Sequence, residues 1–89
     1  MNDLERRVLD KVGQRVDAAR LDASIVYLDH GPKRAGERLS FPDAAIELPW
    51  DGHVAFVDLE PRANWGHACL YLALQRDGDG VVEQAAQMP

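Results

Sequence analysis

Cysteine is almost absent from this chain of 89 residues, in which Cys69 is the only one. A single cysteine cannot form an internal disulfide, so the composition favours a reducing compartment. Long hydrophobic runs are also missing, since no segment of the sequence approaches the roughly 20 apolar residues that cross a bilayer. Residues 1–7 are mostly polar or charged and do not resemble a secretory signal. We therefore expect a small soluble protein of the cytoplasm.

Basic residues are outnumbered: ten Lys and Arg stand against fifteen Asp and Glu, which gives a net charge of −5. This balance argues against nucleic acids and anionic membranes as partners, because both require a basic surface. The one basic cluster, Lys33, Arg34 and Arg38, lies in a glycine-containing stretch and is interpreted as a solvated loop. A phosphate or carboxylate contact is the alternative. An acidic protein favours a basic protein partner, although charge acts mainly on association rate and specificity.

The hydrophobic content of 46% is sufficient for a core, and the length fits one small domain spanning residues 1–89. An amphipathic helix is predicted over residues 3–20, with Asn2 as its N-cap. Its apolar stripe consists of Leu4, Val8, Val12, Val16 and Ala19. Gly13 weakens this helix by roughly 1 kcal/mol relative to alanine.

Five later segments have the β-branched and aromatic composition of strands. They are residues 24–28, 44–48, 53–59, 67–76 and 81–84. The run Asp77-Gly78-Asp79-Gly80 is a strong turn signal. The predicted fold is α+β, with the N-terminal helix packed on a small, mainly antiparallel sheet of three to five strands.

The strands at 53–59 and 67–76 are expected to form a hairpin in which Leu59 lies opposite His67. One face, which the helix would cover, then carries Val54, Phe56, Leu70, Leu72 and Leu74. The other face carries Ala55, Val57, Leu59, His67, Cys69 and Tyr71. This second face is too apolar to remain in water. Either residues 30–50 fold across it, or a partner covers it.

The segment between these strands is the candidate site, because it places a Trp, a His and the only Cys between two apolar runs. Trp and Arg dominate binding hot spots, and Asn adds directional hydrogen bonds. The predicted partner-binding residues are Arg62, Asn64, Trp65, His67 and Tyr71. In the alternative interpretation, Trp65 packs against its own strand ends.

Chemistry at Cys69 is the weaker hypothesis. His67 and Cys69 lie two apart on a strand and so share a face, but a thiol nucleophile also needs an orienting group and an oxyanion hole. A zinc site needs about four converging ligands, and His53 and His67 lie at opposite ends of the hairpin. We expect no metal and no cofactor.

The leading hypothesis is a non-enzymatic protein-binding module (an adaptor, regulator, immunity-type or other accessory protein) that binds another protein or itself. The alternative is a thiol-dependent hydrolase or transferase, or a subunit of one.

Overall fold

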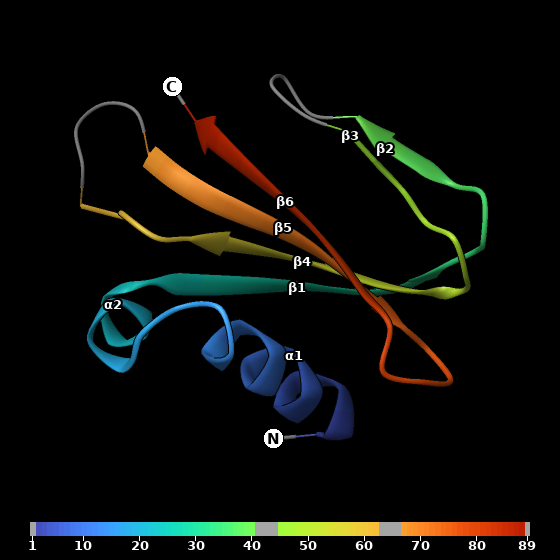
Figure 1. Ribbon diagram of the computed structural model, residues 1–89, viewed down its shortest axis with the longest axis horizontal. Coiled ribbons are helices and arrows are strands. Elements are labelled where there is room, and N and C mark those ends of the chain that lie inside the picture. Colours follow the sequence, from blue (N-terminus) through green and yellow to red (C-terminus); the bar gives the residue numbers. More distant parts are fainter. Residues whose placement is uncertain (1, 41–44, 63–66, 89) are drawn as a thin grey trace.

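The computed structural model describes residues 2–40, 45–62 and 67–88, without the side chains of residues 67, 87 and 88. The fold is α+β, as predicted: an N-terminal helical segment packs on a four-stranded antiparallel sheet of order β1-β4-β5-β6, and β2 and β3 form a separate two-stranded sheet (Figure 1). The elements are α1 (Asp3–Gly13), α2 (Ala18–Ala23), β1 (Ile25–Lys33), β2 (Arg38–Ser40), β3 (Ala45–Glu47), β4 (Gly52–Asp58), β5 (His67–Gln75) and β6 (Val81–Met88). In the described part of the chain, no helix is long and apolar enough to cross a membrane.

The N-terminal segment forms two helices, so the prediction of one helix over residues 3–20 was wrong. The predicted cap is present: the Asn2 side chain accepts a hydrogen bond of 2.8 Å from the Glu5 amide. Helix α1 ends at Gly13, a residue with low helix propensity. The Asp17 carboxylate then caps α2 by accepting a 2.9 Å hydrogen bond from the Arg20 amide. A side chain that bonds nearby backbone in this way competes with continuation of a helix.

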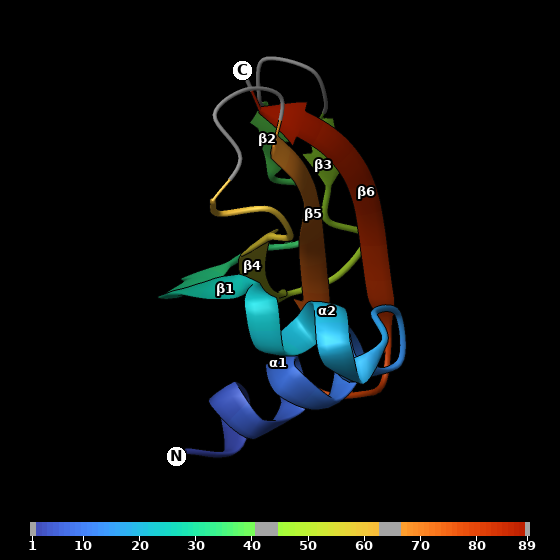
Figure 2. The same cartoon turned by 90° about the vertical axis from the view of Figure 1, so that its left-hand side faces the viewer.

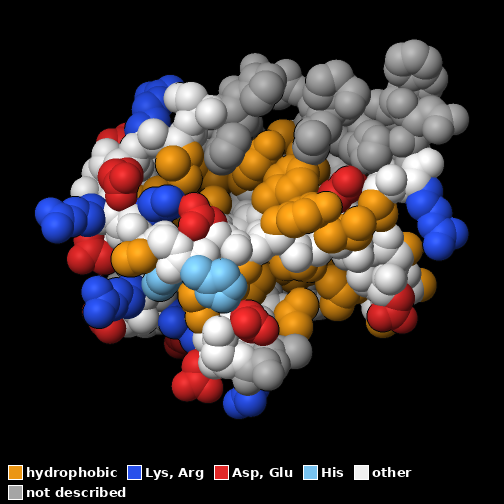
Figure 3. Space-filling view, turned by 180° about the vertical axis from the view of Figure 1, so that it is seen from behind, with side chains coloured by type: hydrophobic (Ala, Val, Ile, Leu, Met, Phe, Trp, Pro, Cys, Tyr) orange, Lys and Arg blue, Asp and Glu red, His pale blue; other side chains and the backbone are white. Residues whose placement is uncertain are grey.

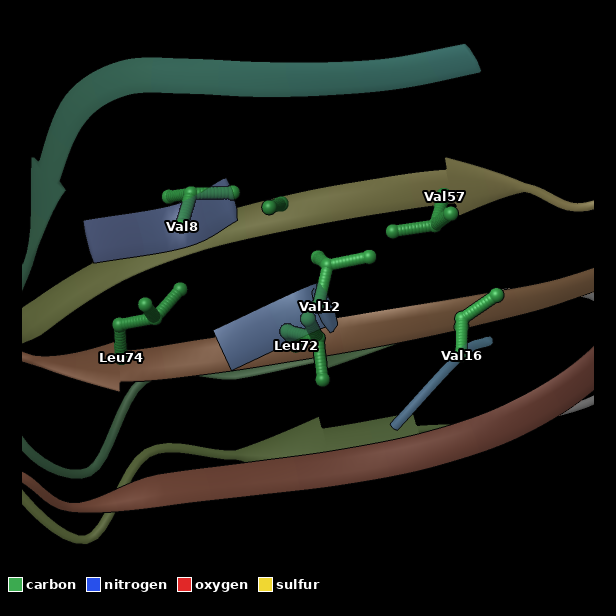
Figure 4. Close-up of a cluster of buried hydrophobic side chains, with 7 residues drawn as sticks. Val8, Val12, Val16, Val57, Leu72 and Leu74 are labelled. Atoms are coloured by element: carbon green, nitrogen blue, oxygen red, sulfur yellow. The ribbon is translucent and has the colours of Figure 1, made fainter. Parts of the chain in front are cut away.

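Helix α1 covers one face of the main sheet, and the core lies between them. Val8 and Val12 point from α1 onto β4 and β5, where Leu72 and Leu74 are almost completely buried (Figure 4). The predicted apolar stripe therefore packs as expected as far as Val16, which joins the same cluster although it lies between the two helices. Ala19, the last residue of the predicted stripe, is exposed on α2. The leucines of β5 also face the helix as predicted.

The register of the β4–β5 hairpin differs from the prediction by one residue. Asp58 lies opposite Cys69 and Val57 lies opposite Leu70. A one-residue shift turns every side chain of a strand to the other face. The face assignment of β4 was therefore wrong: Ala55 and Val57 face the helix, whereas Val54 and Phe56 belong to the opposite side. Because both faces of β4 are apolar, alternation alone could not fix the register.

The second face of the sheet is covered in part by the chain itself. Helices and the β2–β3 sheet lie on opposite sides of the main sheet (Figures 1 and 2). Ile46 and Leu48 are buried against Cys69 and Tyr71 of β5, and β3 also contacts β6. The first of the two alternatives, a cover formed by residues 30–50, is thus confirmed for the part of this face that Ile46 and Leu48 bury. The hydrophobic cluster that these residues form on the second face contains no residue of β1, so this cover is confined to the β4–β5–β6 side of the sheet.

Candidate functional site

Strand β1 forms one edge of the main sheet. It pairs with β4 on one side, and no described strand pairs with its other side. Three large hydrophobic side chains are exposed in the described part of the chain: Leu9 at 37%, Ile25 at 42% and Tyr27 at 55%. Ile25 and Tyr27 belong to β1, Leu9 lines a hollow together with residues of this strand, and hydrophobic side chains gather over it in Figure 3. The exposed apolar surface is thus concentrated along one open sheet edge.

An aromatic row crosses the sheet and ends at that edge. Tyr27 lies opposite Phe56, which lies opposite Tyr71 in the next strand. The ring centroids are 5.8 Å apart for the first pair and 5.1 Å for the second, with tilted rings in both. These separations are favourable for aromatic pairs. Exposure rises along the row, from buried Tyr71 through half-buried Phe56 to exposed Tyr27, so the outer side of the last ring is open to solvent.

The other face of β1 borders a groove. A hollow of about 280 Å³ lies between α1 and β1 and is lined by Glu5, Val8, Leu9, Val26, Leu28 and His30. Val26 and Leu28 alternate with Ile25 and Tyr27 along the strand, so the two pairs lie on opposite faces. An extended chain laid beside β1 would therefore find apolar surface for its alternate side chains on both faces of the sheet.

The two halves of β1 differ in how their outer edge is protected. Between Asp29 and Lys33 the register with β4 shifts, Pro32 removes one backbone N–H from the strand, and the two charged side chains form an ion pair of 2.9 Å. The hydrogen bond from Lys33, together with that from the Gly31 amide, lowers the pKa of Asp29. Bulges, prolines and charges are the usual means of preventing strand addition. The stretch from Ile25 to Leu28 carries none of them.

The predicted loop residues have different locations. Arg62 is exposed and lines a hollow together with Ile25, so it borders the N-terminal end of the same edge. Asn64 and Trp65 lie outside the described residues, and so does the side chain of His67 at the start of β5. Tyr71 is buried within the chain against Phe56. Of the predicted set, Arg62 alone is described as a solvent-exposed side chain.

The thiol is remote from solvent. Cys69 is 1% exposed and packs in the cluster between β5 and the β2–β3 sheet, so a substrate could reach its sulfur only if that cluster opened.

In the described ranges, no group of three or more His, Cys, Asp or Glu residues could hold a metal ion. His53 lies opposite Leu74, at the far end of β5 from His67. Burial, with the charges of Arg7 and Arg76, lowers the pKa of His53.

Sequence reasoning missed the β1 edge. The run Ser-Ile-Val-Tyr-Leu at residues 24–28 predicts a strand, but only the strand order shows that it lies at the edge and that Tyr27 ends an aromatic row. Comparison of the chain with models of protein families, with curated proteins and with solved structures finds no match.

Proposed function

We propose that this chain is a non-enzymatic protein-binding module that accepts an extended segment of another polypeptide as an added strand along β1. The observation that supports this proposal is the position of the exposed hydrophobic side chains Leu9, Ile25 and Tyr27, all of which border that edge. In strand addition, main-chain hydrogen bonds supply affinity and the sites for alternate side chains supply specificity. Full burial of one such side chain contributes about 1.5–3 kcal/mol.

The partner segment would be extended, with apolar residues at alternate positions. One set of its side chains would contact Ile25 and Tyr27, and the other would enter the groove between α1 and β1. A single cysteine, buried in the core, is compatible with work in the reducing cytoplasm.

The proposal is tested by affinity capture from a lysate of the cell that produces the protein. Wild type is compared with Tyr27→Lys, since a lysine on a sheet edge opposes strand addition. Gln84→Lys is the matched control, because Gln84 is exposed and lies in the same row of the sheet on the opposite edge strand. A partner retained by wild type and the control but lost by Tyr27→Lys is the expected result.

Hydrogen exchange then locates the contact. The β1 amides that point away from β4 should become protected when the captured partner is added, because an added strand bonds to them. Capture by Tyr27→Lys at the wild-type level would contradict the proposal. If Trp65→Ala lost the partner while Tyr27→Lys kept it, the binding surface would be the predicted loop.

A further inference from the structure

We infer that the strand accepted by β1 is β1 of a second copy of this chain, in an antiparallel pair around a twofold axis at Tyr27. This inference depends on the proposed strand addition and specifies its partner. Identical antiparallel strands related by such an axis form an isologous interface, in which each residue and its counterpart exchange the same contacts.

The geometry of β1 selects the position of the axis. The stretch that pairs with β4 without interruption is Ile25–Asp29, and its central residue is Tyr27. An axis at Tyr27 uses the whole of this regular stretch and places Val26 opposite Leu28 of the second copy. An axis at Asp29 would set two carboxylates directly opposite each other, which is destabilising. An axis at Val26 would leave a shorter overlap, because the strand begins at Ile25.

This pairing covers the apolar side chains at the centre of the edge, while Ile25 lies at the end of the paired stretch. On one face, Tyr27 meets Tyr27 of the second copy, so the aromatic row continues through six rings across an eight-stranded sheet. On the other face, Val26 and Leu28 form two apolar pairs. The two α1 helices then lie on the same side of the joined sheet, and each presents its exposed Leu9 to the shared groove.

The charges of β1 are compatible with this arrangement. Asp29 lies opposite Ile25 of the second copy, so the two Asp29 carboxylates are at opposite ends of the paired stretch. Each already forms an ion pair with Lys33 of its own chain. The register shift and Pro32 beyond Asp29 end the regular pairing with β4, which limits the added strand to this stretch and opposes further addition.

Sedimentation equilibrium measures the association directly. We expect wild type and Gln84→Lys to form a dimer with the same dissociation constant, and Tyr27→Lys to raise that constant at least tenfold. Ile25→Lys serves as a second variant if circular dichroism shows that Tyr27→Lys is not folded. A wild type that remains monomeric up to the highest concentration measured, or a folded Tyr27→Lys that dimerises like wild type, would overturn the inference.

Cross-linking tests the register. Directly opposite residues have Cβ atoms about 4.5–5.5 Å apart, a separation close to that of disulfides. With oxidised glutathione as oxidant, Tyr27→Cys should form a covalent dimer, whereas Gln84→Cys should not. Ile25→Cys should cross-link poorly to itself but well to Asp29→Cys in an equal mixture. In a dimeric protein, cross-linking of Tyr27→Cys no faster than that of Gln84→Cys would refute the axis.

These outcomes separate the inference from the proposed function. A monomeric wild type whose captured partner is lost on Tyr27→Lys substitution would reject the second copy and retain strand addition. A monomeric wild type with capture unaffected by Tyr27→Lys would reject both.

Discussion

Arg7 connects α1 to the turn between β5 and β6, and its removal should be costly. Its guanidinium donates hydrogen bonds to the carbonyls of Gln75 at 2.5 Å, Gly78 at 2.9 Å and, more weakly, Arg76 at 3.3 Å. Hydrogen bonds from a charged donor contribute about 1.5–3 kcal/mol each. Since the site is partly exposed and the three bonds share one group, we expect Arg7→Met to lower the free energy of unfolding by about 2–4 kcal/mol.

This loss is large for the chain. A domain of 89 residues is stable by about 4–13 kcal/mol, and a decrease of 2–4 kcal/mol should lower Tm by about 10–30 °C. Urea unfolding followed by circular dichroism measures the difference. The matched control is Arg6→Met, because Arg6 is exposed and its contact with Asp3 is 3.9 Å long. Surface pairs of this kind contribute little, so the control should change stability by less than about 0.5 kcal/mol.

The same substitution has an independent second readout. The charge of Arg7 is one of the causes that lower the pKa of His53. Arg7→Met should therefore raise the pKa of His53 towards its ordinary value, although burial keeps it below that value. A titration of the imidazole followed by NMR detects this change. Equal stability losses in Arg6→Met and Arg7→Met, with no change in the pKa of His53, would refute the reasoning.

Three further predictions concern the core, the pH dependence and the thiol. Leu72→Ala should reduce stability by about 2–5 kcal/mol, because the side chain is completely buried; a near-neutral result in urea unfolding would contradict the assigned core. His53 binds a proton near pH 6.5 when unfolded and only at lower pH when folded, so stability should fall as pH is lowered through 6.5. This slope should be smaller in His53→Gln, and an unchanged slope would remove His53 as its cause. Cys69 should react slowly with iodoacetamide in the native protein and quickly in urea, as mass spectrometry can show; fast native labelling would instead support the thiol-enzyme alternative.

The parts of the fold that follow from local periodicity could be predicted. The stripe from Val8 to Val12 and the leucines of β5 each show one apolar face, and the structure packs them together. The break between the two helices could not be predicted from periodicity. It depends on the low helix propensity of Gly13 and on the capping side chain of Asp17, and neither changes the spacing of the apolar residues. The register of β4 could not be predicted, because its two apolar faces satisfy either pairing.

The candidate site was less accessible to sequence reasoning than the fold. Residue type alone points to Trp65 and Arg62, and Arg62 does border the β1 edge. The strand pattern predicts that Tyr71 lies on an uncovered binding surface, yet Ile46 and Leu48 pack on that face. The exposure of Tyr27 depends on strand order, a long-range property that no local pattern in residues 24–28 contains.

In the chain, the residues of the β2–β3 sheet come between β1 and β4, and this order has a consequence for folding kinetics. Strands β4, β5 and β6 are consecutive in the chain, whereas β1 reaches β4 only after residues 34–51 have been traversed. Loop closure over a longer segment costs more entropy, and nonlocal pairing is slow. The three consecutive strands should therefore assemble first, and β1 should join them last. Its detachment would then be a low-energy opening of the native state that exposes Phe56, and a second chain bound along β1 would suppress this opening.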